Sequence, residues 1–517
     1  MTSQFAKPVL KTKHQRFILP TLLFIILFLY LGILQSSPTM LDPDGFYHAK
    51  MAELTWENGF ISSFPWLPET TLATNWTDQH FLYHLLLAPL SAVIDPLWAV
   101  KIGAVILGAL FGLTFFIVLS NFIRNKRAAF WWTILMFTSG ALMFRLTLVK
   151  AQPLALILFI LLLWSFIKKR IFLFSVLMFL YVLAHGSFII IPGLIGWSIV
   201  FSIFFVEEKK KAVLSSLLFL CLAAVSIIAS LAVQPTFPDN MVFYWHQIFR
   251  IALFKVDGLD ITGLEWGILT PWGLTKALSQ LILFIGFTIF LLIKYKKSIT
   301  RTTWLLLWFL VPLTFLTLRS MRNFEFFLPA LILCIASTFK DARTRLLESQ
   351  LWLTIRMTTS RHALILLFIP ILFLTWFLYP MVSIFVNQTK AKPLTFMQEQ
   401  AVFLSRVTQK GELIVNTYWD MFPALFYYNT HNTYLTGLDP AFLQLKRPEV
   451  YRALVEMRKG NFSATSKLLP GGQRDAYIIF YNYDKDNKDI VAESKRYDTI
   501  THILTTDEFH LFRFTDK

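Results

Sequence analysis

Asp42, Asp44 and His48 lie close together in a short polar segment directly after the first apolar run of the sequence. Asp42-Pro43-Asp44 is a good helix start, with Asp42 as N-cap and Pro43 at the first helical position. In a helix from Pro43 onward, Asp44 and His48 are four residues apart and face the same way. Such a pair can bind a divalent cation or act as general base and partner, so a structural and a catalytic interpretation both stay open.

A second polar cluster closes the same loop and reads Asn75-Trp76-Thr77-Asp78-Gln79-His80. Asp78 has the residue type of an N-cap. His80 and His84 have the helical spacing of two zinc ligands, but no third ligand accompanies them. We expect Asp78 and His80 to support the Asp44 site or to contact an acceptor.

The elements that carry these residues must be membrane helices. The chain of 517 residues is 56% hydrophobic and only 15% charged, where ordinary globular domains are about a quarter charged. Repeated uncharged runs of spanning length exclude a disordered, collagen-like or nucleic-acid-binding chain. The net charge of +17 then indicates the positive-inside rule, and Cys221 and Cys334, both in apolar runs, exclude a disulfide framework.

The sequence predicts a polytopic α-helical membrane protein with about eleven transmembrane helices, because a hydrocarbon core about 30 Å thick needs about 20 apolar residues per helix. The apolar runs are 17–36, 99–122, 128–144, 151–167, 171–186, 188–206, 212–233, 276–293, 302–318, 324–339 and 362–386.

Loop charges predict the orientation. Counted alternately from the N-terminus, one set of loops holds 22 Lys and Arg and the other set holds 7. The N-terminus is therefore expected in the cytoplasm, with the 37–98 loop, the 234–275 loop and residues 387–517 outside. We interpret the first apolar run as a retained anchor rather than a cleaved signal peptide.

Four cations on the expected outer side run against this charge bias. Arg145 and Lys150 lie between the third and fourth runs, and Arg319 and Arg322 lie between the ninth and tenth. Long cationic side chains at helix ends also reach the headgroup layer without any further role. The alternative is that these four residues hold a lipid phosphate, for which arginine is well suited. His185 lies in a turn that faces the same compartment and is a further contact or a turn residue.

Residues 387–517 differ from the apolar part, because charges return and short β-type runs alternate with helical stretches. The expected strands include Leu413 to Asn416 and Ala476 to Tyr481, and the expected helices cover 394–408 and 440–459. The predicted organisation is a transmembrane domain over 1–386 and an extracytoplasmic α/β domain over 387–517.

This combination resembles the GT-C superfamily of integral membrane glycosyltransferases. Asp44-Gly45-Phe46 is similar to the catalytic-aspartate segment of oligosaccharyltransferase catalytic subunits. Ile414-Val415-Asn416-Thr417-Tyr418-Trp419-Asp420 lies where those enzymes have a strand that leads into a W-W-D-Y-G motif for acceptor recognition. Trp419 and Asp420 keep two residues of that motif, so the resemblance implies that they contact an acceptor.

One departure from the family concerns metal binding. The family carries a second acidic motif, which supplies metal ligands, in the turn that here reads Arg145 to Pro153 and has no carboxylate. The resemblance leaves two alternatives. Asp44 and His48 bind a divalent cation such as Mg²⁺ or Mn²⁺, or the site works without metal.

The resemblance implies transfer of a sugar or oligosaccharide from a polyprenyl phosphate or pyrophosphate donor to an acceptor on the extracytoplasmic side. Asp44 would activate the acceptor and Arg322 would hold the phosphate. The alternative is a non-catalytic scaffold or transporter with GT-C architecture, which the missing acidic motif favours. The expected partners are the lipid bilayer, the lipid-linked donor and an acceptor of unknown class, without nucleic acid. The expected location is a bacterial inner membrane, because the outer domain lacks cysteine.

Overall fold

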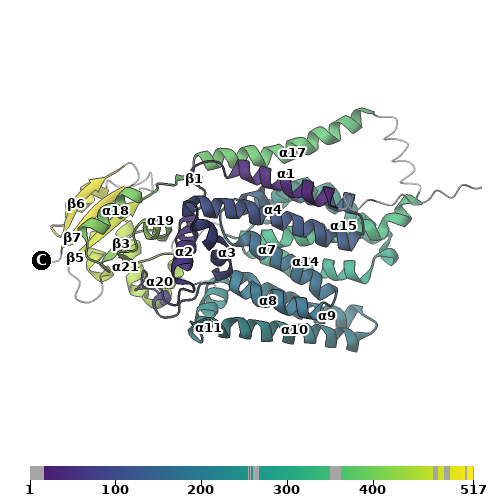
Figure 1. The fold of residues 1–517 in the computed structure, drawn as a ribbon, viewed down its shortest axis with the longest axis horizontal. Coiled ribbons are helices and arrows are strands. Elements are labelled where there is room, and N and C mark those ends of the chain that lie inside the picture. Colours follow the sequence, from purple (N-terminus) through teal and green to yellow (C-terminus); the bar gives the residue numbers. More distant parts are fainter. Residues whose placement is uncertain are drawn as a thin grey trace, which may run out of the picture.

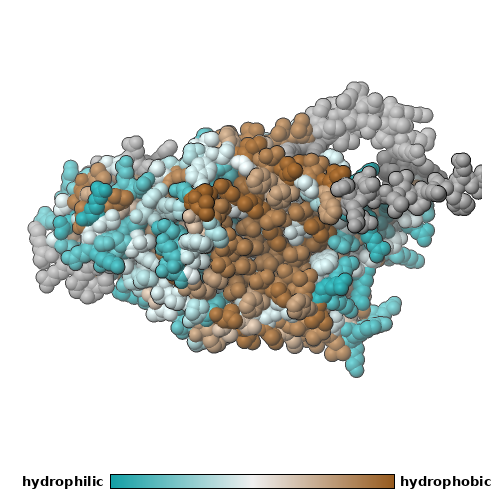
Figure 2. Space-filling view, viewed as in Figure 1, coloured by the Kyte–Doolittle hydropathy of each residue, from teal (hydrophilic) through white to brown (hydrophobic). Residues whose placement is uncertain are grey.

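The computed structural model describes residues 17–253, 256, 258–259, 267–349, 363–469, 475–481, 490–506 and 509–515. Figure 1 shows a bundle of long helices at one end of the molecule and a β-sheet with short helices at the other. Helices α2, α3 and α19 lie between these two parts. Figure 2 shows a hydrophobic band around the bundle, with hydrophilic residues on either side of it. The chain is a multi-pass membrane protein.

The bundle is built from helices that overlap the expected apolar runs, except that α12 lies mostly before the run 276–293. They are α1 (Ile18–Leu34), α4 (Pro96–Ile123), α5 (Lys126–Met136), α6 (Gly140–Leu146), α7 (Gln152–Ile167), α8 (Ile171–Ala184), α9 (Ile190–Phe205), α10 (Lys209–Ala232), α12 (Pro271–Ala277), α13 (Ile282–Lys294), α14 (Arg301–Arg319), α15 (Phe324–Leu347) and α17 (Ala363–Thr389).

Two of the expected spans are broken. Helices α5 and α6 meet at 80°, and α12 meets the helical segment 279–294 at 67°. Ser139 caps the new helix α6 by accepting from the backbone N–H of Leu142. Five helices of the described residues are long and apolar enough to cross a membrane, or up to seven if each bent pair is one span. The count of eleven is therefore not confirmed, because α1, α7 and α8 are shorter than that criterion allows.

The outer loop contains α2 (Asp44–Asn58) and α3 (Phe81–Ser91). The expectation that Asp42 is the N-cap of α2 is wrong, because the helix begins at Asp44 and Pro43 occupies the cap position. Asp42 still supports this start, since its Oδ1 accepts from the backbone N–H of Asp44 at 3.0 Å. Just before it, β1 (Thr39–Met40) pairs antiparallel with β2 (Lys392–Pro393) and ties the end of α1 to the segment after α17.

The C-terminal part holds a five-stranded sheet in the order β4-β3-β5-β7-β6. Strand β3 is parallel to β4 and β5, whereas β7 is antiparallel to β5 and β6. The strands are β3 (Leu413–Asn416), β4 (Thr433–Tyr434), β5 (Asp475–Tyr481), β6 (Ile500–Thr505) and β7 (Phe509–Thr515). The helices are α18 (Gln398–Val407), α19 (Phe422–Tyr428), α20 (Pro440–Lys446), α21 (Pro448–Arg458) and α22 (Ile490–Ser494).

Helix α19 packs against α2 and joins the C-terminal part to the outer loop. The ring of Tyr427 lies 6.1 Å from that of Phe46, and the ring of Phe426 lies 6.3 Å from that of Tyr47. The loop after α2 also bonds to the sheet edge, because Tyr434 N donates to the carbonyl oxygen of Trp66 at 2.8 Å. The start of α2, which carries Asp44, is thus held between the bundle and the sheet.

Candidate active site

Asp42 and Asp44 share one lysine. Lys150 Nζ lies 2.8 Å from Asp42 Oδ2 and 2.8 Å from Asp44 Oδ2. The lysine side chain is 8% exposed, whereas those of Asp42 and Asp44 are 22% and 27% exposed. Among the described residues, the Oδ1 atom of Asp44 has no hydrogen-bond partner. The cluster thus offers one carboxylate oxygen at a surface that solvent or a substrate can reach.

Several contacts fix the backbone around this cluster. Lys101, which is buried in α4, donates from Nζ to the carbonyl oxygen of Thr39 at 2.6 Å. Gln35, buried at the end of α1, donates from Nε2 to the carbonyl oxygen of Thr147 at 2.8 Å. The segment that leads to Asp42 is therefore tied to α4, and the turn with Lys150 is tied to the end of α1.

A buried chain of hydrogen bonds runs from Asp78 to the helix that carries Asp44. His84 Nδ1 donates to Asp78 Oδ2 at 2.6 Å, because an ionised carboxylate only accepts. In its neutral form His84 then accepts at Nε2, and His48 Nδ1 donates to that atom at 2.8 Å. His48 is left with Nε2 as an acceptor. All three side chains are buried, so this chain orients His48 one helical turn after Asp44.

Both His48 and His80 are neutral near pH 7. Burial lowers the pKa of His48 well below its usual range, and the nearby charges of other site histidines and of Lys150 add to the effect. Burial also lowers the pKa of His80 to about 4, with a further lowering by His84 and an opposing effect of Asp78.

Arg322 and His185 lie beside the same histidines. The positive charge of Arg322 contributes to the lowered pKa of His80, so this arginine lies within electrostatic range of the cluster. The rings of His80 and His185 are 5.2 Å apart, and those of His48 and His80 are 5.3 Å apart. His185 also caps the turn that follows α8 by accepting from the backbone N–H of Ser187. The rings of His48, His80 and His185 therefore lie in sequence next to one another, and Arg322 lies within electrostatic range of His80.

Three of the four expected phosphate ligands have other partners. Lys150 pairs with Asp42 and Asp44. Arg145 Nε lies 2.9 Å from Glu325 Oε2, with the two side chains 8% and 1% exposed. Arg319 donates from Nη2 to the carbonyl oxygen of Leu253 at 3.3 Å. Their roles in phosphate binding stay predictions.

The fold was compared with known proteins. No protein-family model and no curated protein sequence matches the chain. Solved structures do match it. The oligosaccharyltransferase AglB of Archaeoglobus fulgidus, in complex with an inhibitory peptide and a dolichol-phosphate, has a TM-score of 0.60 at 13% identity, over 90% of this chain and 70% of that chain. ArnT of Cupriavidus metallidurans bound to undecaprenyl phosphate has a TM-score of 0.58 at 12% identity, over 97% of this chain and 98% of that chain.

The chain has the GT-C fold. Both neighbours are GT-C glycosyltransferases, so the resemblance expected from the sequence is confirmed for the fold. Sequence identities of 12% and 13% carry no residue roles, so the site must be judged from its own geometry.

Trp419 and Asp420 lie in the GT-C fold on a one-turn 3₁₀-helix, Trp419–Met421, between β3 and α19. Buried Asn416 holds this connection, since its Nδ2 donates to the carbonyl oxygens of Tyr418 and Thr436. This turn precedes the start of α19, and Asp44 is at the start of α2, the helix on which α19 packs. The role of Trp419 and Asp420 in acceptor contact stays a prediction.

The donor set does not fit the expected metal pair of Asp44 and His48. Nδ1 of His48 is bonded to His84, and Oδ2 of Asp44 is bonded to Lys150. In the part of the chain that the structure describes, no group of three or more His, Cys, Asp and Glu side chains could hold a metal ion.

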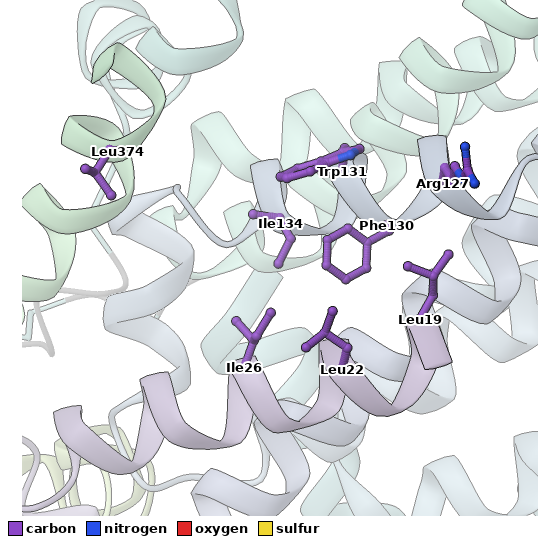
Figure 3. Close-up of a pocket in the computed structure, with 8 residues that line it drawn as sticks. All are labelled: Leu19, Leu22, Ile26, Arg127, Phe130, Trp131, Ile134 and Leu374. Atoms are coloured by element: carbon purple, nitrogen blue, oxygen red, sulfur yellow. The ribbon is translucent and has the colours of Figure 1, made fainter. Parts of the chain in front are cut away.

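An apolar cavity of about 500 Å³ lies elsewhere, between the first half of α1, α5 and α17 (Figure 3). Leu19, Leu22 and Ile26 of α1 face Phe130, Trp131 and Ile134 of α5, with Leu374 on α17 and Arg127 at one end. Leu22 lies about 18 Å along the helix from the end of α1 near Asp44, at 1.5 Å per residue. The cavity therefore belongs to the helix bundle and is separate from the candidate site.

The hydrogen bonds of His84 were not predicted from the sequence, in which its spacing from His80 gave only weak evidence of a zinc ligand. The available signal was the short spacing of Asp78 and His84 across a helix start. The N-cap position of α3 is occupied by His80 and not by Asp78, but the Asp78 carboxylate still accepts from the backbone N–H of His80 and from His84 in the first turn.

Proposed function

We propose that the protein is a membrane glycosyltransferase that moves a sugar or oligosaccharide from a polyprenyl phosphate or pyrophosphate donor to an acceptor on the extracytoplasmic side. The observation that carries this proposal is the Asp44 carboxylate, about a quarter exposed, which Lys150 holds through one oxygen while the other oxygen stays open. The GT-C fold supports it, because its neighbours were solved with dolichol-phosphate and undecaprenyl phosphate. The proposed location is a bacterial inner membrane with the N-terminus in the cytoplasm.

Asp44 acts as the general base in this proposal. A nucleophilic oxygen or nitrogen of the acceptor attacks the anomeric carbon, and the bond from that carbon to the phosphate oxygen breaks with its electron pair on the phosphate. The proton of the acceptor passes to the open oxygen of Asp44. A single displacement of this kind inverts the anomeric configuration.

Arg322 is the proposed phosphate ligand. Its guanidinium stabilises the negative charge that grows on the leaving phosphate, and it has five N–H donors for that purpose. Its electrostatic effect on His80 supports a place at the edge of the site. Asp78 and His84 orient His48 behind Asp44.

A panel of polyprenyl-linked donors tests the proposal. Membranes that contain the wild-type protein, Asp44→Ala or Asp475→Ala are incubated with radiolabelled sugar on each lipid. Asp475 is the control because it is a half-exposed carboxylate at the start of β5. We expect transfer by the wild type and by the control and none by Asp44→Ala.

The alternative is a non-catalytic scaffold or transporter with the same fold. The absence of a carboxylate in the sequence between α6 and α7 favours this alternative. No labelling with any donor favours that alternative, whereas equal labelling in the Asp44→Ala and wild-type membranes contradicts the role of Asp44.

A further inference from the structure

The turn between α6 and α7 places an ammonium group between two carboxylates. Lys150 Nζ is equally close, at 2.8 Å, to Oδ2 of Asp42 and to Oδ2 of Asp44. The lysine is less exposed than either partner, so it lies deeper and the carboxylates cover it. Two carboxylates separated by one residue repel each other, and this internal cation offsets the repulsion.

The residue before Lys150 has a strained backbone conformation. Val149 has a φ of +57°, a left-handed conformation that is unfavourable for a β-branched residue. Such strain persists only where surrounding contacts impose it. One such contact is the hydrogen bond from Gln35 to the carbonyl oxygen of Thr147, on the same turn. The position of the ammonium is thus imposed by the fold.

A divalent cation would compete for the same oxygens. Mg²⁺ demands near-octahedral coordination by oxygen and usually binds to one or two carboxylates. Asp42 and Asp44 could supply two such ligands, but Lys150 already occupies one oxygen of each. The nearest further candidate, His48, is committed to His84 through Nδ1.

We infer that the Lys150 ammonium takes the place of a divalent cation between Asp42 and Asp44, so that sugar transfer needs no added metal. The inference rests on the proposed function. Lys150 is a positioning residue that acts through Asp44: its ammonium group holds one carboxylate oxygen, Oδ2, and leaves the other for the acceptor. The acceptor's proton moves to that second oxygen while the sugar–phosphate bond breaks, and Lys150 keeps its own proton throughout.

Direct Mn²⁺ binding to the purified full-length chain, followed by electron paramagnetic resonance, is the first test. We expect Lys150→Ala to bind one Mn²⁺ at a concentration where the wild type binds none. The double variant Lys150→Ala/Asp44→Asn should lose that binding again. Lys410→Ala is the matched control, because Lys410 is an exposed lysine of the C-terminal part. Wild-type protein that binds Mn²⁺ as well as Lys150→Ala overturns the inference.

Transfer rates are the second test. The wild type should work at the same rate in EDTA and in Mn²⁺. Lys150→Ala should lose about 10- to 100-fold in kcat, the effect of one charged hydrogen bond, with the KM for the lipid donor nearly unchanged. Mn²⁺ should restore part of that loss. Lys150→Met, which keeps the length of the side chain without its charge, replaces Lys150→Ala if the smaller residue prevents folding.

Either of two results overturns the inference: a wild type inactivated by EDTA and restored by Mn²⁺, or a Lys150→Ala variant with the wild-type kcat. A wild type that transfers no sugar from any donor contradicts the proposed function instead. The Mn²⁺ measurement requires no transfer, so the two failures can be told apart.

Discussion

Two cations near the junction of α6 and α7 have different environments: Arg145 is in the last turn of α6, and Lys150 is in the connection to α7. Arg145 pairs with Glu325 of α15, and both side chains are almost completely buried. Lys150 pairs with Asp42 and Asp44, whose carboxylates are about a quarter exposed. The first pair joins two helices of the bundle, whereas the second lies beneath an accessible surface.

This difference in exposure distinguishes an ion pair that stabilises the fold from one that can take part in a reaction. A buried pair costs desolvation on both sides, and it cannot exchange a partner for a substrate without leaving a charge unpaired. A carboxylate that keeps one oxygen open can take a proton while its other oxygen stays bonded. Of the two, only the Lys150 cluster can serve transfer chemistry, and the predictions below test that division.

Removal of one partner from the buried Arg145–Glu325 pair should have the largest effect on stability. Glu325→Gln leaves Arg145 buried beside a neutral group, which we expect to cost about 3–5 kcal/mol. Thermal unfolding in detergent measures the loss. Glu348→Gln, at the exposed end of the same helix, is the control and should change little. An unfolding midpoint of Glu325→Gln equal to that of the control would show that the Arg145–Glu325 pair does not stabilise the fold.

Arg322→Gln should weaken donor binding. The loss of a charged hydrogen bond to phosphate corresponds to a KM for the lipid donor about 10- to 100-fold higher. Initial rates over a range of donor concentrations measure it. Arg301→Gln, an exposed arginine at the opposite end of α14, should leave the KM unchanged. If both variants keep the wild-type KM, Arg322 does not hold the phosphate.

Stability should fall as the pH decreases through the range in which the histidines titrate. Unfolded His80 takes up a proton near pH 6.5, whereas in the folded protein its pKa is about 4. The unfolded state therefore binds more protons between these values, with a slope of up to about 1.4 kcal/mol per pH unit for one histidine. Unfolding midpoints from pH 7.5 to 4 should fall more steeply for the wild type than for His80→Asn. Equal dependence of the two unfolding midpoints on pH would contradict a lowered pKa of His80 in the folded protein.

Arg513→Ala should have the smallest effect. Arg513 and Asp475 are both half-exposed and 3.4 Å apart at the nearest atoms, and such surface pairs contribute less than about 1 kcal/mol. The unfolding midpoint should stay within a few degrees of the wild type. A loss as large as that of Glu325→Gln would mean that burial does not distinguish the two kinds of pair.

The sequence predicted the apolar helices and the helix start around Asp44 because both depend on local signals. Apolar runs mark helices whatever packs around them, and Asp42-Pro43-Asp44 marks a helix start. The fold resemblance followed from the order of such segments, and the solved structures confirm it.

The partners of Arg145 and Lys150 could not be predicted in the same way. Both residues are cations five positions apart, and the sequence left both open between contact with the headgroup layer and phosphate binding. The break between α5 and α6 and the left-handed Val149 direct the two side chains to different neighbours, Glu325 for one and Asp44 for the other. These are tertiary contacts between segments far apart in the chain, and local patterns do not report them. His84 was misinterpreted for the same reason, because its second partner is on another helix.

The central claim is that Asp44 performs sugar transfer on a stably held scaffold, and Asp44→Asn tests it most directly. Transfer rate, binding of a polyprenyl phosphate and unfolding midpoint are measured on the same purified preparation. We predict that kcat falls about 10²–10⁴-fold, the range for loss of a general base, while lipid binding and the midpoint stay close to the wild type. An Asp44→Asn protein that transfers sugar at the wild-type rate would contradict the account.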